Sequence, residues 1–166
     1  MLVFVAGLPG SGKSFFASRL AETIHAVYLS SDVIRKELIP NPSYSAQEKE
    51  QVYESILKKM HEAAKQGHNI VIDATFYQKT IRARFIKEAK QIAANFVFIE
   101  IKAEEALIKK RVSAKREYSD ADFEVYKKIK AAFEPIEEKH LVLQSKENNI
   151  EDMLQITYTF FKRNND

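Results

Sequence analysis

Near the start of the chain, residues 7–14 carry glycine, lysine and serine at the spacing Gly-x-x-x-x-Gly-Lys-Ser. Glycines at this spacing let the backbone curl, so that successive N–H groups can point at one phosphate group. A helix that opens at Lys13 would add the positive end of its dipole, and the lysine side chain would reach the β- and γ-phosphates. Ser14 would supply a hydroxyl ligand for magnesium. We therefore expect a site for a nucleoside triphosphate, in the first place ATP with Mg²⁺.

The residues on either side of this motif favour a phosphate loop over a chance glycine-rich turn. An apolar run at residues 2–6 precedes the motif and predicts a buried strand, and Phe16, Leu20 and Ile24 follow it at helical spacing. A position between a strand and a helix is the context that the motif requires. The residues expected to contact the nucleotide are Gly7, Pro9, Gly10, Ser11, Gly12, Lys13, Ser14 and Phe15.

A carboxylate and a guanidinium follow the second predicted strand, residues 26–29. Asp32 and Arg35 are one helical turn apart, so they lie on the same side if the segment is helical. Because the carboxyl ends of parallel strands meet at one edge of a sheet, Asp32 is expected beside the γ-phosphate. There it could accept the proton of an attacking hydroxyl, while Arg35 clamps a phosphate or an anionic part of the acceptor. The alternative is that Ser31 or Asp32 caps a helix and that Arg35 is a solvated surface charge.

A second carboxylate, Asp73, ends the third predicted strand at residues 69–72. This position is typical of an aspartate that supports magnesium or its waters, and we predict that role for it beside Ser14. The next residue is Ala74 instead of a glutamate that could activate water, which favours transfer to a bound acceptor over hydrolysis. Thr75 and Arg82 are weaker candidates for positioning the acceptor. The alternative for Asp73 is a strand-end aspartate that caps the following turn.

Five basic side chains crowd into residues 109–116. In a phosphate-loop kinase such a cluster is expected on a lid, here about residues 109–133, that closes over the triphosphate. Arg111 and Arg116 are the candidates for contacting the transferring phosphoryl group, because a guanidinium matches phosphate geometry better than lysine does. The alternatives are a solvated helix face or a contact to a nucleic-acid backbone. No series of aromatic residues accompanies the cluster, which makes the nucleic-acid alternative weaker.

Short apolar runs alternate with longer amphipathic segments, which predicts an α/β fold with a parallel sheet wrapped by helices. Ser45 with Glu48 predicts a capping box before a long helix, and Ser119 with Asp122 predicts a second, weaker cap. The five expected strands are residues 2–6, 26–29, 69–72, 96–101 and 141–143.

The composition places limits on the class of protein. The chain has 166 residues, of which 45% are hydrophobic, enough for the core of one domain spanning residues 1–166. Its formal net charge of +3 suits an anionic substrate without by itself indicating nucleic acid. The sequence contains no cysteine, and we interpret its four histidines as structural or surface residues outside any metal site. Residues 2–6 are too few for a signal peptide or a membrane span, so we expect a cytoplasmic protein without a membrane partner.

These motifs resemble a family, the small P-loop kinases related to polynucleotide 5′-hydroxyl kinases and zeta-toxin-type kinases. The resemblance covers roughly residues 1–145. It implies a three-layer fold with a five-stranded parallel sheet in the order 2-3-1-4-5 and a helical lid. In that family the aspartate matching Asp32 is the general base, and the arginine matching Arg35 binds the acceptor phosphate or steadies the γ-phosphate. Lid arginines, matched here by Arg111 or Arg116, stabilise the transferring group.

The resemblance also implies what the chain acts on, in general terms. The expected reaction is transfer of the γ-phosphoryl group of ATP, with Mg²⁺, to a hydroxyl of an unidentified acceptor. Nucleic-acid 5′ ends, nucleotide sugars and small metabolites are all acceptors of kinases that share these motifs. Residues 144–146 loosely match a loop that often contacts the nucleotide base. One alternative is a nucleotide-binding switch or ATPase without an acceptor. Another is a nucleic-acid-binding module that shares only the phosphate loop with these kinases.

Overall fold

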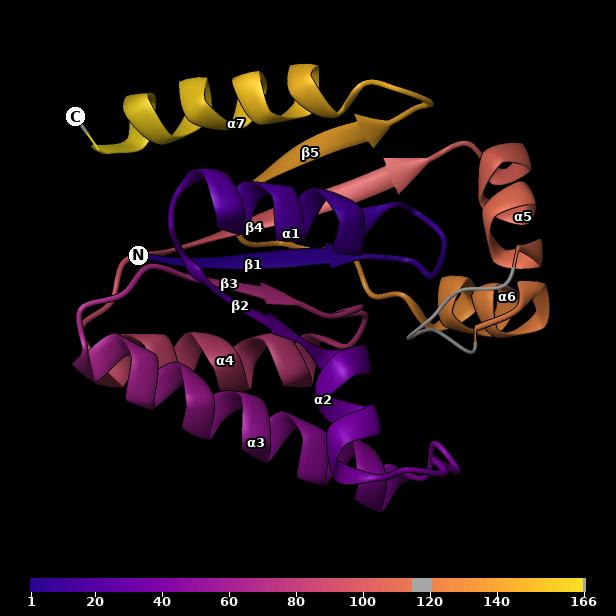
Figure 1. Ribbon diagram of the computed structural model, residues 1–166, viewed down its shortest axis with the longest axis horizontal. Coiled ribbons are helices and arrows are strands. Elements are labelled where there is room, and N and C mark those ends of the chain that lie inside the picture. Colours follow the sequence, from indigo (N-terminus) through magenta and orange to yellow (C-terminus); the bar gives the residue numbers. More distant parts are fainter. Residues whose placement is uncertain (115–120, 166) are drawn as a thin grey trace.

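The computed structural model describes residues 1–114 and 121–165, and five parallel strands form one sheet at its centre (Figure 1). The strand order β2-β3-β1-β4-β5 and the α/β class confirm the expectation. The strands are β1 (Leu2–Gly7), β2 (Val27–Ser30), β3 (Ile70–Asp73), β4 (Phe96–Ala103) and β5 (His140–Ser145). The helices are α1 (Lys13–Thr23), α2 (Ser31–Leu38), α3 (Ala46–Lys65), α4 (Lys79–Gln91), α5 (Glu105–Ser113), α6 (Phe123–Ala132) and α7 (Ile150–Asn165).

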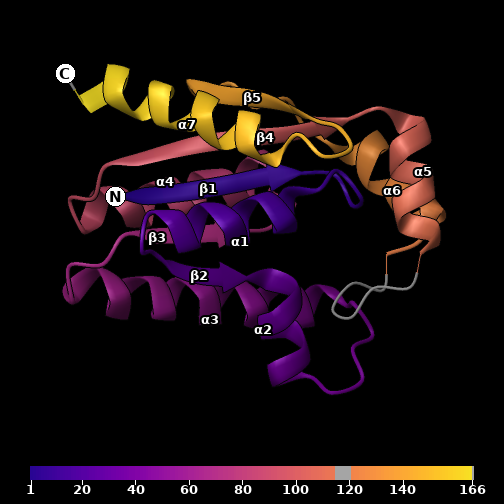
Figure 2. The ribbon, with the colours of Figure 1, turned by 45° about the horizontal axis from the view of Figure 1, so that its top comes forward.

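Helices cover both faces of the sheet and make the three layers. Residues of α1 and α7 pack on one face, and residues of α3 and α4 pack on the other (Figure 1, Figure 2). Between them β1 is buried along its whole length. Its Phe4 ring lies 4.8 to 5.9 Å, centroid to centroid, from the rings of Phe76, Phe85 and Phe98. Apolar burial on both sides thus fixes the strand that leads into the glycine motif.

Each predicted strand lies within about two residues of its expected place. The largest difference is β5, which has twice the expected length because His140, Gln144 and Ser145 also belong to it. This strand lies at the edge of the sheet and pairs only with β4. Since one side of an edge strand faces solvent, it tolerates polar residues that do not signal a strand in the sequence.

The first predicted cap forms in a modified way. The Ser45 hydroxyl accepts from the Glu48 N–H at 3.2 Å, as expected, and begins α3. The Glu48 carboxylate does not return to Ser45. It accepts from the backbone and hydroxyl of Ser43 at 2.9 and 2.7 Å and from the Tyr44 N–H at 2.6 Å. These bonds hold Tyr44 at a positive φ of 59° and lower the pKa of Glu48.

Of the two residues of the second predicted cap, the structure describes Asp122. Asp122 is itself the N-cap of α6, and its carboxylate accepts from the Val125 N–H at 2.9 Å. Ser119 lies outside the described residues. The helices of the expected lid are α5 and α6, which share a small apolar cluster of Ile108, Val112 and Tyr126.

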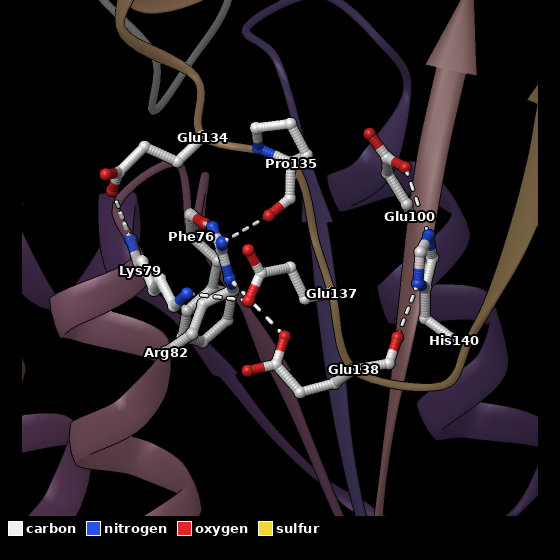
Figure 3. A network of polar contacts seen from close by, with 9 residues as sticks. All are labelled: Phe76, Lys79, Arg82, Glu100, Glu134, Pro135, Glu137, Glu138 and His140. Carbon is white, nitrogen blue, oxygen red and sulfur yellow. Dashed lines mark hydrogen bonds and ion pairs between the residues drawn. The ribbon is translucent and has the colours of Figure 1, made fainter.

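A buried arginine on α4 has a structural role. Arg82 is 0% exposed, and its guanidinium donates to the backbone oxygens of Phe76 and Pro135, both at 2.8 Å. Its Nε lies 3.8 Å from Oε2 of Glu138 (Figure 3). Arg82 therefore joins α4 to the segments that follow β3 and precede β5. The expectation that it positions the acceptor is wrong, because its donors face partners inside the fold.

Replacing this arginine should destabilise the fold. We expect Arg82→Met to lower the free energy of unfolding by on the order of 3–5 kcal/mol, because buried carbonyls and Glu138 lose their partner. Arg84→Met, on the same helix, removes only an exposed ion pair with Glu50 and should cost about 1 kcal/mol or less. Urea denaturation of both variants measures the difference. Equal losses of stability would contradict the structural role.

Candidate active site

The glycine motif forms a tight loop between β1 and α1. Gly10 and Gly12 have φ angles of 79° and 92°, a region that side chains disfavour. A Cβ on Gly10 would lie 2.7 Å from Cγ1 of Val112 on α5. A Cβ on Gly12 would lie 2.8 Å from the Ser145 hydroxyl. The glycines are therefore required by the backbone and by the close approach of α5 and of the end of β5.

The start of α1 is arranged as an anion site. Gly12 is the N-cap and has no side chain to bond the first N–H groups, and the first turn has no acidic residue. Lys13 is only 8% exposed, and within the described residues no carboxylate lies at ion-pair distance from it. Free N–H groups, a helix dipole and a buried cation without a counter-ion together fit a bound phosphate.

A cleft of about 750 Å³ opens beside this helix start. It lies between the first turn of α1, helix α5 and the loop that joins β5 to α7, a size that suits a nucleotide. Of the residues expected to contact the nucleotide, Gly10, Gly12, Lys13, Ser14 and Phe15 line it. Phe15 is 62% exposed. Gly7, Pro9 and Ser11 are buried and do not line this cleft.

Asp73 ends β3 on the α1 side of the sheet, close to Lys13 and Ser14. It is 2% exposed, and burial raises the pKa of its carboxyl, while the Lys13 ammonium and the Ser14 hydroxyl act in the opposite direction. Its Oδ2 accepts a hydrogen bond of 2.9 Å from the Tyr28 hydroxyl, and its Oδ1 has no partner. The Ser14 hydroxyl and the unpartnered Oδ1 of Asp73 are oxygen ligands of the kind that Mg²⁺ prefers.

Asp32 and Arg35 both lie on α2, as predicted. The helix is capped by Ser30, whose hydroxyl accepts from the Val33 N–H at 3.4 Å, so the alternative that Ser31 or Asp32 is the cap is wrong. Asp32 is partly buried and raises the pKa values of both Asp73 and Tyr28, which places it in the same corner of the molecule.

Arg35 is buried, so its interpretation as a solvated surface charge is also wrong. The side chain is 9% exposed, and its Cζ lies 5.0 Å from the centre of the Tyr44 ring. Its Nε and Nη1 atoms are buried without a hydrogen-bond partner. Because buried donors are nearly always paired in native proteins, these two atoms could bond an acceptor group of a ligand.

Arg111 supports the glycine loop in this structure. Its Nη1 donates to the carbonyl of Ser11 and the hydroxyl of Ser145, both at 3.1 Å, and to the carbonyl of Gly10 at 3.4 Å. Its Nη2 donates to the carbonyl of Lys146 at 3.3 Å. Burial lowers the pKa of the guanidinium. Arg111 thus bridges the phosphate loop and the loop after β5, and its direct contact with a transferring phosphoryl group stays a prediction.

Two other basic residues of the cluster, Lys109 and Lys110, have partners away from the phosphate loop. Lys109 lies over the Phe123 ring, and Lys110 pairs with the exposed Glu147. For both lysines the interpretation as a solvated helix face holds, since their side chains are exposed. Arg116, the second candidate for the phosphoryl group, lies outside the described residues.

Several residues of this corner gave no signal in the sequence. Tyr28 and Tyr44 belong to no motif, and their contacts to Asp73 and Arg35 join positions from different elements. In the loop after β5, the Asn149 side chain accepts from the Lys146 N–H and donates to the Gln144 carbonyl. A pair of asparagines after a strand indicates a turn, and this signal could have located the loop.

Two histidines have ordinary partners in the fold. His61 contacts Glu88 at 3.0 Å, and His140 contacts Glu100 at 3.4 Å. In residues 1–114 and 121–165 no three His, Asp or Glu side chains come together as a metal-binding group. No helix in the same residues has both the length and the apolar character to cross a membrane.

Removing Arg111 should weaken nucleotide binding. We expect Arg111→Ala to lower ATP affinity by at least about tenfold, because the loop carbonyls lose charged hydrogen bonds. Arg111→Lys should not restore binding, since an ammonium cannot bridge the same groups. Lys110→Ala is the matched control and should bind ATP normally, which calorimetric titration can measure. ATP affinity unchanged in Arg111→Ala would contradict the bridging role.

The sequence matches the family model described as "AAA domain" over residues 2–136. It is also similar to an L-seryl-tRNA(Sec) kinase of Methanococcus maripaludis, with 30% identity over 116 residues. That alignment covers 67% of this chain and 44% of the relative, so the chain spans less than half of the relative's length. Assignment to the polynucleotide-kinase or zeta-toxin group stays a prediction.

Solved structures of kinases share the fold. A sugar kinase from Janibacter sp. HTCC2649 has a TM-score of 0.72 at 18% identity, covering 97% of this chain and 94% of its own. The APS kinase of Mycobacterium tuberculosis, in complex with AMPPNP and APS, has a TM-score of 0.74 at 18% identity, covering 97% and 96%. Identities this low show the fold alone. By its family match over residues 2–136, the chain belongs to the AAA domain family, and its fold is that of P-loop kinases.

Proposed function

We propose that this protein is a kinase that transfers the γ-phosphoryl group of ATP to a hydroxyl of a bound acceptor. One observation carries the proposal. Lys13 and Arg35 are buried cations without a carboxylate partner within the described residues, and Asp32 lies on the same helix as Arg35. The third buried cation, Arg82, is bonded inside the fold. A site with two unpaired cations and a carboxylate suits an anionic donor and an acceptor that must lose a proton.

On the donor side, the N–H groups at the start of α1 and the Lys13 ammonium would hold the β- and γ-phosphates. The nucleoside would occupy the cleft between Phe15, Arg111 and the loop after β5. Ser14 and the free Oδ1 of Asp73 would hold Mg²⁺, directly or through water. When bound, the metal ion would neutralise the charge that develops on the phosphate oxygens.

On the acceptor side, Asp32 would accept the proton of the attacking hydroxyl as the acceptor oxygen bonds to the γ-phosphorus. The bond from that phosphorus to the bridging oxygen breaks, and ADP leaves with the electron pair. Arg35 would pair with the γ-phosphoryl group or with an anionic part of the acceptor through its unpartnered Nε and Nη1. Arg111 would keep the loop in place, and Arg116 is the further lid candidate.

Hydrolysis without an acceptor is the alternative reaction. Ala74 follows Asp73 and is 1% exposed, so the position that could orient a water molecule carries no carboxylate. This favours transfer over hydrolysis. Because ATP is the proposed donor, we place the reaction in the cytoplasm.

A labelling experiment tests the proposal. The protein is incubated with Mg²⁺ and ATP labelled at the γ-phosphate, against a panel of 5′-hydroxyl DNA and RNA, nucleosides, nucleotide sugars and sugars. L-seryl-tRNA and adenosine phosphosulfate are added because the relatives named above act on or bind them. We expect label on one acceptor class and ADP formation that depends on that acceptor. Steady ADP formation without any acceptor would contradict transfer.

The variant Asp32→Asn tests whether Asp32 is the general base. It should bind ATP like the wild type and lower the transfer rate by about 10²–10⁴-fold, because only the proton acceptor is removed. Glu37→Gln, an exposed acid on the same helix, is the matched control and should transfer normally. Parallel loss of ATP binding and transfer in Asp32→Asn would mean that Asp32 supports the fold or the metal instead.

A further inference from the structure

The Asp73 carboxylate is held from one side by a tyrosine of the neighbouring strand. In the register of β2 and β3, Tyr28 pairs with Val71 and Ser30 pairs with Asp73. The Tyr28 side chain therefore reaches diagonally along the sheet to Asp73, a separation that a long aromatic side chain can span. Its hydroxyl donates to Oδ2 of Asp73 at 2.9 Å.

This contact gives the two oxygens of the Asp73 carboxylate different hydrogen bonding. Oδ2 is bonded to Tyr28, whereas Oδ1 is buried and has no partner. In this bond the Tyr28 hydroxyl is the donor, because a carboxylate oxygen can only accept. A carboxylate with one oxygen fixed and the other unpartnered is prepared for a ligand on the unpartnered side.

The Asp73 carboxyl lies close to the phosphate site, since Asp73 pairs with Val5 of β1, two residues before the glycine loop. Lys13 and Ser14 both act on the Asp73 carboxyl, which places the first turn of α1 beside it. Ser30, two residues after Tyr28, caps α2 and so positions Asp32 and Arg35. The edge strand β2 therefore supports both halves of the proposed site.

We propose that Tyr28 is a positioning residue that holds Oδ2 of Asp73 and thereby presents Oδ1, together with the Ser14 hydroxyl, to the divalent cation. The inference rests on the proposed function, since it concerns the metal that accompanies ATP. Partners that orient a metal-supporting carboxylate typically contribute 10–100-fold to metal affinity, and we expect Tyr28 to lie in this range.

The test measures binding, not turnover. ATP is titrated into the full chain in the presence of Mg²⁺ and, separately, of EDTA. Mn²⁺ binding in the presence of ATP is followed by the electron paramagnetic resonance signal of the free ion. In Tyr28→Phe the gain in ATP affinity from Mg²⁺ should shrink by about tenfold or more, and Mn²⁺ affinity should fall similarly. ATP affinity in EDTA should stay as in the wild type, because the loop is untouched.

A matched control variant is available in the same apolar cluster. Tyr28 and Tyr158 each pack against the apolar cluster on the α1 face of the sheet, and the Tyr158 hydroxyl is buried without a partner. Tyr158→Phe removes a hydroxyl of the same kind and should leave both metal readouts unchanged. In an Asp73→Asn background, Tyr28→Phe should have no further effect on Mn²⁺ affinity, because the two residues act as one unit.

Three results would overturn the inference. Wild-type metal dependence in Tyr28→Phe would mean that Asp73 needs no support from Tyr28. A parallel fall of ATP affinity in Mg²⁺ and in EDTA would assign Tyr28 to the fold alone. A wild-type chain whose ATP binding does not respond to Mg²⁺ or Mn²⁺ would contradict the proposed metal site itself, and the inference would fall with it.

Discussion

Burying an ammonium group without a counter-ion costs free energy of folding, and the N-terminal half of this structure contains such a group at Lys13. Lys13 is 8% exposed at the start of α1, where the helix dipole is also positive. Two of the positive charges in this region, Lys13 and Arg35, have no carboxylate partner within the described residues. The Asp73 carboxyl lies nearby, but it forms no ion pair with Lys13. An anionic donor at Lys13 and an anionic group at Arg35 would satisfy these two cations.

The loop that carries Lys13 is held from the side of α5 and α6. Leu8 packs against the apolar cluster of Ile108, Val112 and Tyr126, and Gly10 lies against Val112 with no room for a side chain. Arg111 adds hydrogen bonds to the carbonyls of the same loop. A displacement of α5 would therefore displace the phosphate loop. In the described residues, α5 and α6 of the expected lid pack with the loop that the lid would close over.

The sequence was sufficient for the features that depend on local pattern. Apolar runs and the glycine motif predicted the strands and the loop, because a buried parallel strand must be apolar on both faces. The spacing of Asp32 and Arg35 predicted that they would lie one turn apart if their segment is helical, and α2 meets that condition. The strand order came from the family resemblance, and the sheet confirms it.

The contacts that join distant elements could not be predicted in the same way. Arg82 was expected to help position the acceptor, but the carbonyls of Phe76 and of Pro135, 53 positions away, hold it in the interior. Tyr28 meets Asp73 only through the strand register. Three of the four hydrogen-bond acceptors of Arg111 are backbone carbonyls, which every residue has and which no side-chain pattern marks.

The central claim is that Lys13 and its loop bind the phosphates of ATP. Calorimetric titration of ATP with Mg²⁺ into the wild type and into Lys13→Ala tests it most directly. We expect the wild type to bind one ATP per chain and the variant to lose at least about tenfold in affinity, the effect of removing a charged hydrogen-bonding partner. ATP affinity that is the same in both proteins would contradict this account.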